Sequence, residues 1–241
     1  MEGRCLKFEQ RNRKALATFF CTLILAIVLA SFSHFSFASL PHEGDMIVGG
    51  NETRTIENCE YNMIGNITVK DNATLIIKNA IFNQTGVGSR VGIEVKNQAR
   101  FIVTNTTLII SQDFSSRILV QDEARVDIVN SNIIHSREYL LIEPFDNSTI
   151  NMENSVMSGH DNWVTTNGYS KVYIKNSRID RVTAWVGSTV IIEGSYLGDA
   201  INAWGDSTIT VFESTIRRIR AIGSPTLYVR SSIVKADVEL R

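Results

Sequence analysis

Cysteine and proline are scarce in this chain, which has three of each among its 241 residues. Cys5 and Cys21 fall within the first 38 residues, so the rest of the chain holds only Cys59 and cannot form an internal disulfide. A fold stapled by disulfides is therefore excluded. We expect Cys59 to be a small buried apolar residue.

An excess of charge of either sign is also lacking, because 24 Lys and Arg face 25 Asp and Glu. This balance argues against a generally basic nucleic-acid binder, and a hydrophobic content of 44% excludes intrinsic disorder. The charge is unevenly distributed. The first 38 residues carry five basic and two acidic side chains, which leaves 19 basic and 23 acidic ones in the remainder.

The first 38 residues have the organisation of an export signal. A basic stretch precedes an apolar run over 15–30, and Ser36-Phe37-Ala38 has the small-x-small form that signal peptidase accepts. The uncharged stretch extends to Ser33, about 19 residues, close to one bilayer crossing, so the segment is either a cleaved signal peptide or an uncleaved signal-anchor helix. Both interpretations place Ser39 onward outside the cell. The protein is expected to be secreted or at the cell surface, with membrane contact only through this segment if it is uncleaved.

The rest of the chain repeats one template. Each copy starts at a small residue, with apolar residues two and four positions later and six positions earlier, and a second small residue seven positions later. The starting residues are Ala73, Ala99, Ala124, Ser148, Ser170, Ser188, Ser207 and Pro225, spaced 18 to 26 residues apart. The period-two alternation of apolar residues indicates strands.

Such a short unit cannot bury its own apolar face and must be covered by the copies before and after it. The sequence therefore predicts an all-β fold, a right-handed parallel β-helix (β-solenoid) of about eight coils over residues 64–241. Residues 39–63 are expected to lead into the first coil and to cap it. The exported part is expected to be a single domain.

An asparagine recurs six positions after the starting residue in five successive copies: Asn79, Asn105, Asn130, Asn154 and Asn176. Asparagine tolerates the left-handed backbone conformation that a tight corner needs, and stacked amides can hydrogen-bond from coil to coil. We interpret this column as a structural ladder.

The alternation, the asparagine corner and the stacked aliphatic columns together resemble the right-handed parallel β-helix repeat proteins, the architecture of pectate lyases. The run from Gly50 to Cys59, followed by Gly65 to Leu75, is similar to uncharacterised secreted cell-surface β-helix proteins, most familiar from archaea. The resemblance covers about residues 47–241 and implies the fold. It implies no activity, because the aspartate-pair, Gly-His-Gly and Arg-x-Lys signatures of polygalacturonases are missing from the sequence.

The sequence contains six Asn-x-Ser/Thr sequons, at Asn51, Asn66, Asn72, Asn83, Asn105 and Asn147. They can be glycosylated only in an exported protein whose cell has a glycosylation system. Asn105 belongs to the corner column and is expected to be a poor acceptor. Asn72 and Asn147 precede strands, and Asn83 is expected in a loop.

Function in a solenoid is expected on the outward columns, since the inward ones form the core. Three positions before the starting residue, the alternation points Trp185 and Trp204 outward on neighbouring coils, where they should stack side by side. Exposed tryptophans are suited to contact with a sugar ring. The alternatives are cover by a loop of the same chain and contact with a partner.

A cluster of acidic and basic residues offers an enzymatic alternative. Asp180 and Asp199 occupy similar positions in neighbouring copies, Arg217 follows one copy later, and His160 lies in the loop of the copy before. Two carboxylates about 5 to 9.5 Å apart are the machinery of glycosidases, and arginine beside them suits a uronate. Ion pairing between coils is the structural alternative.

The sequence thus favours a non-catalytic extracellular or envelope-associated scaffold that presents a surface for carbohydrate or protein contact. Its expected partner is an extracellular polysaccharide or another envelope protein, with no nucleic acid, cofactor or metal. The alternative is a polysaccharide-acting lyase or glycoside hydrolase that uses the acidic and basic cluster. Open coil edges leave end-to-end assembly as a third possibility.

Overall fold

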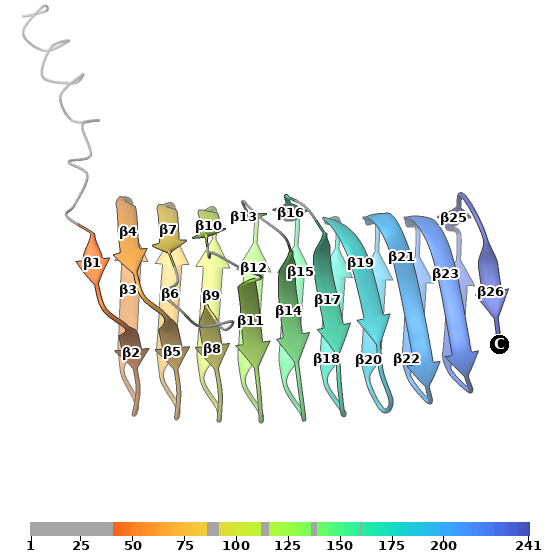
Figure 1. Ribbon diagram of the computed structural model, residues 1–241, viewed down its shortest axis with the longest axis horizontal. Helices are drawn as coiled ribbons and strands as arrows, with labels where there is room; N and C mark the ends of the chain where they lie inside the picture. Colours follow the sequence, from red (N-terminus) through yellow and green to blue (C-terminus); the bar gives the residue numbers. More distant parts are fainter. Residues whose placement is uncertain (1–40, 86–91, 112–115, 136–138, 160) are drawn as a thin grey trace, which may run out of the picture. The chain divides into compact units, whose positions relative to one another are not determined.

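The computed structural model describes residues 41–85, 92–111, 116–135, 139–159 and 161–241. Over these ranges the backbone forms an all-β parallel solenoid of about nine turns, in which the strands of each coil lie beside those of the next (Figure 1). Residues 1–38, expected to form a signal peptide or signal-anchor helix, lie outside the described residues.

One face of the solenoid is a nine-stranded parallel sheet with one strand from every coil. Neighbouring strands pair over five residues without a register shift, so that Val126, for example, lies opposite Ile150. In chain order the strands are β3 (Thr53–Glu57), β6 (Thr74–Lys78), β9 (Arg100–Thr104), β12 (Arg125–Val129), β15 (Thr149–Glu153), β18 (Lys171–Lys175), β20 (Thr189–Glu193), β22 (Thr208–Phe212) and β24 (Thr226–Arg230).

The remaining strands run in two columns on the other side of the coils (Figure 1). The first column consists of β1 (His42–Glu43), β4 (Glu60–Ile64), β7 (Ile81–Thr85), β10 (Thr107–Ser111), β13 (Asn132–His135) and β16 (Val156–Ser158). The second consists of β2 (Met46–Val48), β5 (Ile67–Val69), β8 (Ile93–Val95), β11 (Ser116–Val120), β14 (Leu140–Pro144) and β17 (Asn162–Thr166). In the next three coils the columns merge into β19 (Arg178–Ala184), β21 (Tyr196–Gly205) and β23 (Thr215–Gly223), and β25 (Ile233–Val234) and β26 (Val238–Leu240) follow.

The apolar columns predicted from the sequence line the interior. Parallel pairing places equivalent residues against one another, as Leu75 against Phe101, and both are fully buried. Each large apolar side chain buried in this way contributes about 1.5–3 kcal/mol to folding. The columns lose their cover at the C-terminal end, where Val229 is 40% exposed and Leu240 71%.

The predicted number of eight coils is wrong by one, because β1, β2 and β3 form a further coil before Ala73. This coil lies within residues 39–63, which we expected only to lead in and to cap. Arg54 lies opposite Leu75 and so stands in an inward column, with its guanidinium 2.8 Å from Glu52 Oε1. A charge in that column breaks the apolar template that identifies the other coils, and an inward-pointing charge also blunts the free edge of a sheet.

The asparagine column forms one corner of the coils. Its five members have φ between 46° and 49°, and Asn58, with φ of 55°, belongs to the same column in the additional coil. The amide of Asn105 donates to Asn79 Oδ1 over 3.2 Å, and that of Asn154 donates to Asn130 Oδ1 over 3.2 Å. The corner therefore combines a backbone conformation that asparagine tolerates with bonds between successive coils.

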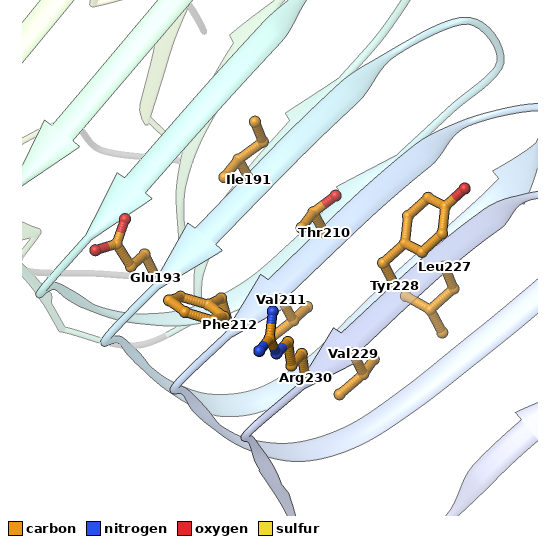
Figure 2. A pocket seen from close by; sticks show the side chains of 9 residues that line it. All are labelled: Ile191, Glu193, Thr210, Val211, Phe212, Leu227, Tyr228, Val229 and Arg230. Atoms are coloured by element: carbon orange, nitrogen blue, oxygen red, sulfur yellow. The ribbon is translucent and has the colours of Figure 1, made fainter.

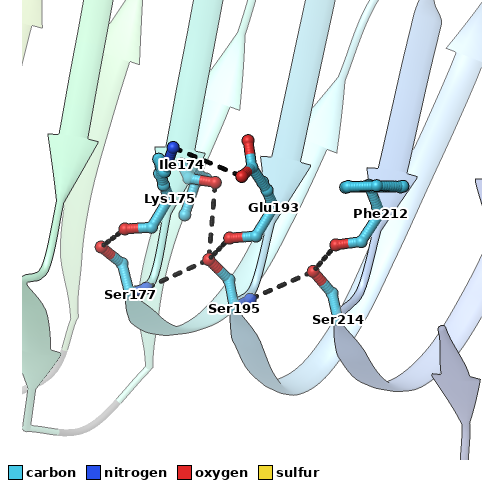
Figure 3. Close-up of polar contacts among 7 residues, drawn as sticks. All are labelled: Ile174, Lys175, Ser177, Glu193, Ser195, Phe212 and Ser214. Carbon is cyan, nitrogen blue, oxygen red and sulfur yellow. Dashed lines mark hydrogen bonds and ion pairs between the residues drawn. The ribbon is translucent and has the colours of Figure 1, made fainter. Parts of the chain in front are cut away.

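The small residue that follows the asparagine forms a second ladder, which is built from serine (Figure 3). The N–H of Ser177 donates to Ser195 Oγ over 3.1 Å, and the N–H of Ser195 donates to Ser214 Oγ over the same distance. Each hydroxyl donates to the carbonyl two residues earlier, as Ser195 does to Glu193 O over 2.7 Å. Thr106, Ser131, Ser155 and Ser232 repeat this pattern, so the ladder satisfies one corner N–H of each coil.

The opposite corner has a ladder that we did not predict. Asp71, Asn97, Asp122 and Asp146 have φ between 56° and 63°. Their carboxylates accept backbone N–H groups of neighbouring coils; the Asn97 N–H, for example, lies 2.8 Å from Asp122 Oδ2. Aspartate and asparagine share the ability to bond locally in a left-handed turn, and this common property is the signal that a search for identical residues overlooks.

Candidate functional site

The Trp185–Trp204 pair lies where β19 and β21 end on the second column of strands. The two indoles stack with centroids 5.1 Å apart and an interplanar angle of 17°, as the alignment of the copies predicts. Trp185 is 39% exposed and Trp204 is half-buried. Each ring therefore uses one face to contact the other, and only the outward-directed faces and edges remain for a ligand.

The neighbours of the pair in the same outward column differ on its two sides. Beyond Trp204 lies Ile222, its partner in the parallel register. Beyond Trp185 lies the shorter Asn167, because the Trp185 N–H donates to Thr166 O over 3.1 Å. The free face of Trp185 thus overlooks a smaller side chain, which agrees with the greater exposure of this indole.

Two further exposed apolar side chains belong to the turns beside the pair. Tyr169 is 73% exposed and Val186 is 59% exposed. A Cβ added to Gly187 would lie 3.4 Å from the Tyr169 ring, so this tyrosine leans over the turn that follows Trp185. We call the surface formed by Tyr169, Trp185, Val186 and Trp204 the tryptophan face.

Polar side chains flank the tryptophan face on the same strands. Asn202 donates to Thr183 Oγ1 over 3.2 Å on neighbouring coils. Glu143, whose side chain is 12% exposed, forms an ion pair of 3.1 Å with Arg117. Burial raises the pKa of Glu143, and the guanidinium of Arg117 acts in the opposite direction. Hydrogen-bonding groups therefore lie beside the apolar rings.

Trp163 forms a second aromatic contact that our sequence analysis did not single out. It stacks on Tyr139 with centroids 5.5 Å apart, and the guanidinium of Arg181 lies 4.5 Å from its ring centroid on the other side. Trp163 faces Arg181 in the strand register. Extending the alignment by one more outward column would have brought these two side chains together.

The acidic and basic residues of the enzymatic alternative have structural partners in the described part of the chain. Asp180 accepts bonds from the backbone N–H and the side-chain amide of Asn162, over 3.1 and 3.0 Å. Asp199 is paired with Arg181, whose Nε lies 2.9 Å away. Arg217 is exposed on β23, and His160 lies outside the described residues. Both carboxylates thus join neighbouring coils.

The sequons are distributed over corners and strands. Asn51, Asn72, Asn105 and Asn147 are exposed, and Asn66 and Asn83 are half-buried. Asn83 lies in β7 and not in a loop as expected, and its amide donates to Asn62 Oδ1 over 2.7 Å. Cys59 also differs from expectation, because it is only partly buried against the core.

A cavity of about 650 Å³ lies at the free edge of the nine-stranded sheet (Figure 2). Ile191, Thr210 and Tyr228 line it from the outward columns, whereas Leu227 and Val229 belong to the inward ones. The cavity therefore wraps around the edge of β24 and includes the uncovered end of the core. It lies on another sheet than the tryptophan face, and end-to-end assembly at this edge stays a prediction.

Comparison with known proteins assigns no relative to the chain. It matches no protein-family model, and no curated protein or solved structure matches it. Among the residues that the structure describes, no three His, Cys, Asp or Glu side chains are grouped so that they could hold a metal ion. The same ranges contain no helix with the length and apolar character needed to cross a membrane.

Proposed function

We propose that this protein is an exported, right-handed parallel β-helix that acts as a non-catalytic scaffold and contacts carbohydrate through its tryptophan face. The stacked Trp185–Trp204 pair carries this proposal. Export rests on the apolar segment and the small-x-small sequence in residues 1–38. The scaffold would stand in the extracellular space or at the cell envelope, where polysaccharide is the abundant partner.

The chemistry of a sugar suits the tryptophan face. A pyranose ring has apolar C–H faces, which pack against aromatic rings, and polar hydroxyl groups around its edge, which need hydrogen-bond partners. The indoles offer the first kind of contact, and Thr183, Asn202 and the indole N–H groups offer the second. Large exposed apolar side chains that gather on a soluble protein mark an interaction site, and the rigid coils hold these side chains in fixed positions.

Binding without catalysis is favoured by the contacts of the acidic residues. A glycosidase needs one carboxyl group that donates a proton and a second that acts as nucleophile or base, both open to the substrate. Asp199 is held by Arg181, and Asp180 is occupied by two bonds from Asn162. These carboxylates act as ties between coils.

The proposal is tested by replacing both Trp185 and Trp204 by alanine and measuring retention on columns of immobilised neutral and acidic polysaccharides. We expect the double variant to lose retention. Tyr228→Ala is the matched control, because it removes a side chain that is 62% exposed on the nine-stranded sheet, away from the tryptophan face. Equal retention of the double variant and the wild type would remove carbohydrate contact and leave an envelope protein as the occupant of this face.

A further inference from the structure

The outward column that holds the tryptophan pair has a gap between two aromatic side chains. Phe145, Asn167 and Trp185 follow one another on three successive coils, because the Asn167 N–H donates to Pro144 O over 3.0 Å and the Trp185 N–H donates to Thr166 O over 3.1 Å. Asparagine is much shorter than the residues on either side of it. We call this interruption of the column the Asn167 notch.

The width of the notch matches the thickness of a ring. Phe145 and Trp185 are two coils apart, which corresponds to about 9.6 Å along the solenoid axis. Trp185 and Trp204, one coil apart, already stack with their centroids separated by 5.1 Å. A ring-shaped ligand placed over Asn167 would therefore lie at about this separation from both neighbours, where an aromatic side chain is missing from the column.

The base of the notch offers hydrogen bonds to a ligand. The Asn167 amide lies 3.5 Å from Glu143 Oε1, a contact long enough to be weak but short enough to orient the amide. Within the described residues, Asn167 Oδ1 and the second N–H of the amide take part in no hydrogen bond. An acceptor and a donor are therefore directed away from the strand, which suits a hydroxyl group.

The charge of the surroundings selects the type of ring. Glu143 is paired with Arg117 at 3.1 Å, so the charges behind the amide compensate each other. The nearby corner carries Asp146, whose carboxylate accepts the N–H of Asp122. A uronate or a sugar phosphate would meet an acidic corner and an arginine already neutralised by its partner. An uncharged ring is favoured over an anionic one.

We propose that the Asn167 notch binds one neutral pyranose unit of a polysaccharide, with its two faces against Phe145 and Trp185 and a hydroxyl group bonded to the Asn167 amide. This inference rests on the proposed function, since it names the class of sugar that the tryptophan face takes. The Trp185 indole serves the ligand with the face that Trp204 does not cover. Trp204 holds that indole in place and does not touch the sugar.

The test is calorimetric titration of the full chain with cellohexaose, xylohexaose and mannohexaose, and with hexagalacturonate as the anionic probe. We expect at least one neutral probe to bind and hexagalacturonate to bind at least tenfold more weakly. Asn167→Trp should abolish binding because the new indole fills the notch. Asn167→Ala leaves the space but removes the amide, and should weaken binding by about tenfold.

Two results would overturn the notch. One is binding by Asn167→Trp with the affinity of the wild type, and the other is an absence of binding to all three neutral probes. Far-UV circular dichroism of Asn167→Trp checks the fold, and the backbone bond to Pro144 O does not depend on the side chain. If Asn167→Trp binds normally while the Trp185 and Trp204 double variant loses retention, the notch is wrong and the tryptophan face stands. If that double variant keeps retention, both proposals fall.

Discussion

Replacement of Ser195 by alanine tests whether the serine ladder stabilises the solenoid. Ser195 Oγ accepts the buried N–H of Ser177 over 3.1 Å and donates to Glu193 O over 2.7 Å. The variant loses both bonds and leaves the Ser177 N–H without a partner in a site where Ser177 is 5% exposed. A buried donor left unsatisfied costs about 1–3 kcal/mol. We expect Ser195→Ala to lower the free energy of unfolding by about 2 kcal/mol in urea denaturation followed by circular dichroism.

The matched control is Ser170→Ala, also a buried serine at a corner of the coils. Among the described residues, the hydroxyl of Ser170 has no hydrogen-bond partner, and alanine occupies the equivalent position at Ala73, Ala99 and Ala124. Removing an unsatisfied buried hydroxyl is neutral or stabilising. If both variants shifted the unfolding midpoint equally, the ladder would contribute nothing beyond the loss of a hydroxyl, and the reasoning from its bonds would be refuted.

Two other properties of the coils lead to measurable effects. Gly194→Ala should destabilise the protein by about 1–2 kcal/mol in the same assay, because φ is 56° and the new Cβ would lie 2.4 Å from Asn176 Oδ1, whereas Glu213→Gly at the same corner, with φ of 48°, should gain up to about 1 kcal/mol. Burial lowers the pKa of His135 below its usual 6.5, so the unfolded chain takes up the proton more readily and stability, complete above about pH 6.5, falls as the pH drops through the folded pKa. Urea midpoints at about pH 7 and about pH 5 should differ more for the wild type than for His135→Gln, and equal differences would contradict this assignment.

The sequence predicts most of the solenoid because its columns have a physical cause. In parallel pairing, equivalent residues of successive coils face one another, so the interior requires apolar residues at the same place in every copy. The first coil escapes this reasoning at Arg54, where cover of the free edge outweighs burial of an apolar side chain. The second corner escapes it because Asp71 and Asn97 have one backbone conformation but different side chains.

The candidate site is less predictable than the fold, since a column alignment states which side chains are neighbours but not what each contact consumes. It pairs Trp185 with Trp204 correctly, yet the carboxylate of Asp199 also needed its partner, and Arg181 comes from the preceding coil at an offset that a β-bulge introduces. An irregularity of one residue in β21 changes which charges meet. Such local shifts have no signature in the spacing of the copies.

Stacking of the two tryptophans bears directly on where a sugar can bind. Two indoles side by side on a flat surface would offer a platform as wide as two coils, but indoles stacked face to face at 5.1 Å cover half of their own π-surface. The ring area left for a ligand lies at the ends of the stack, and Ile222 adjoins one end while the short Asn167 adjoins the other. A contact surface in this column therefore depends as much on the small residue beside the pair as on the tryptophans, and lengthening that residue should do more harm to binding than shortening Trp204.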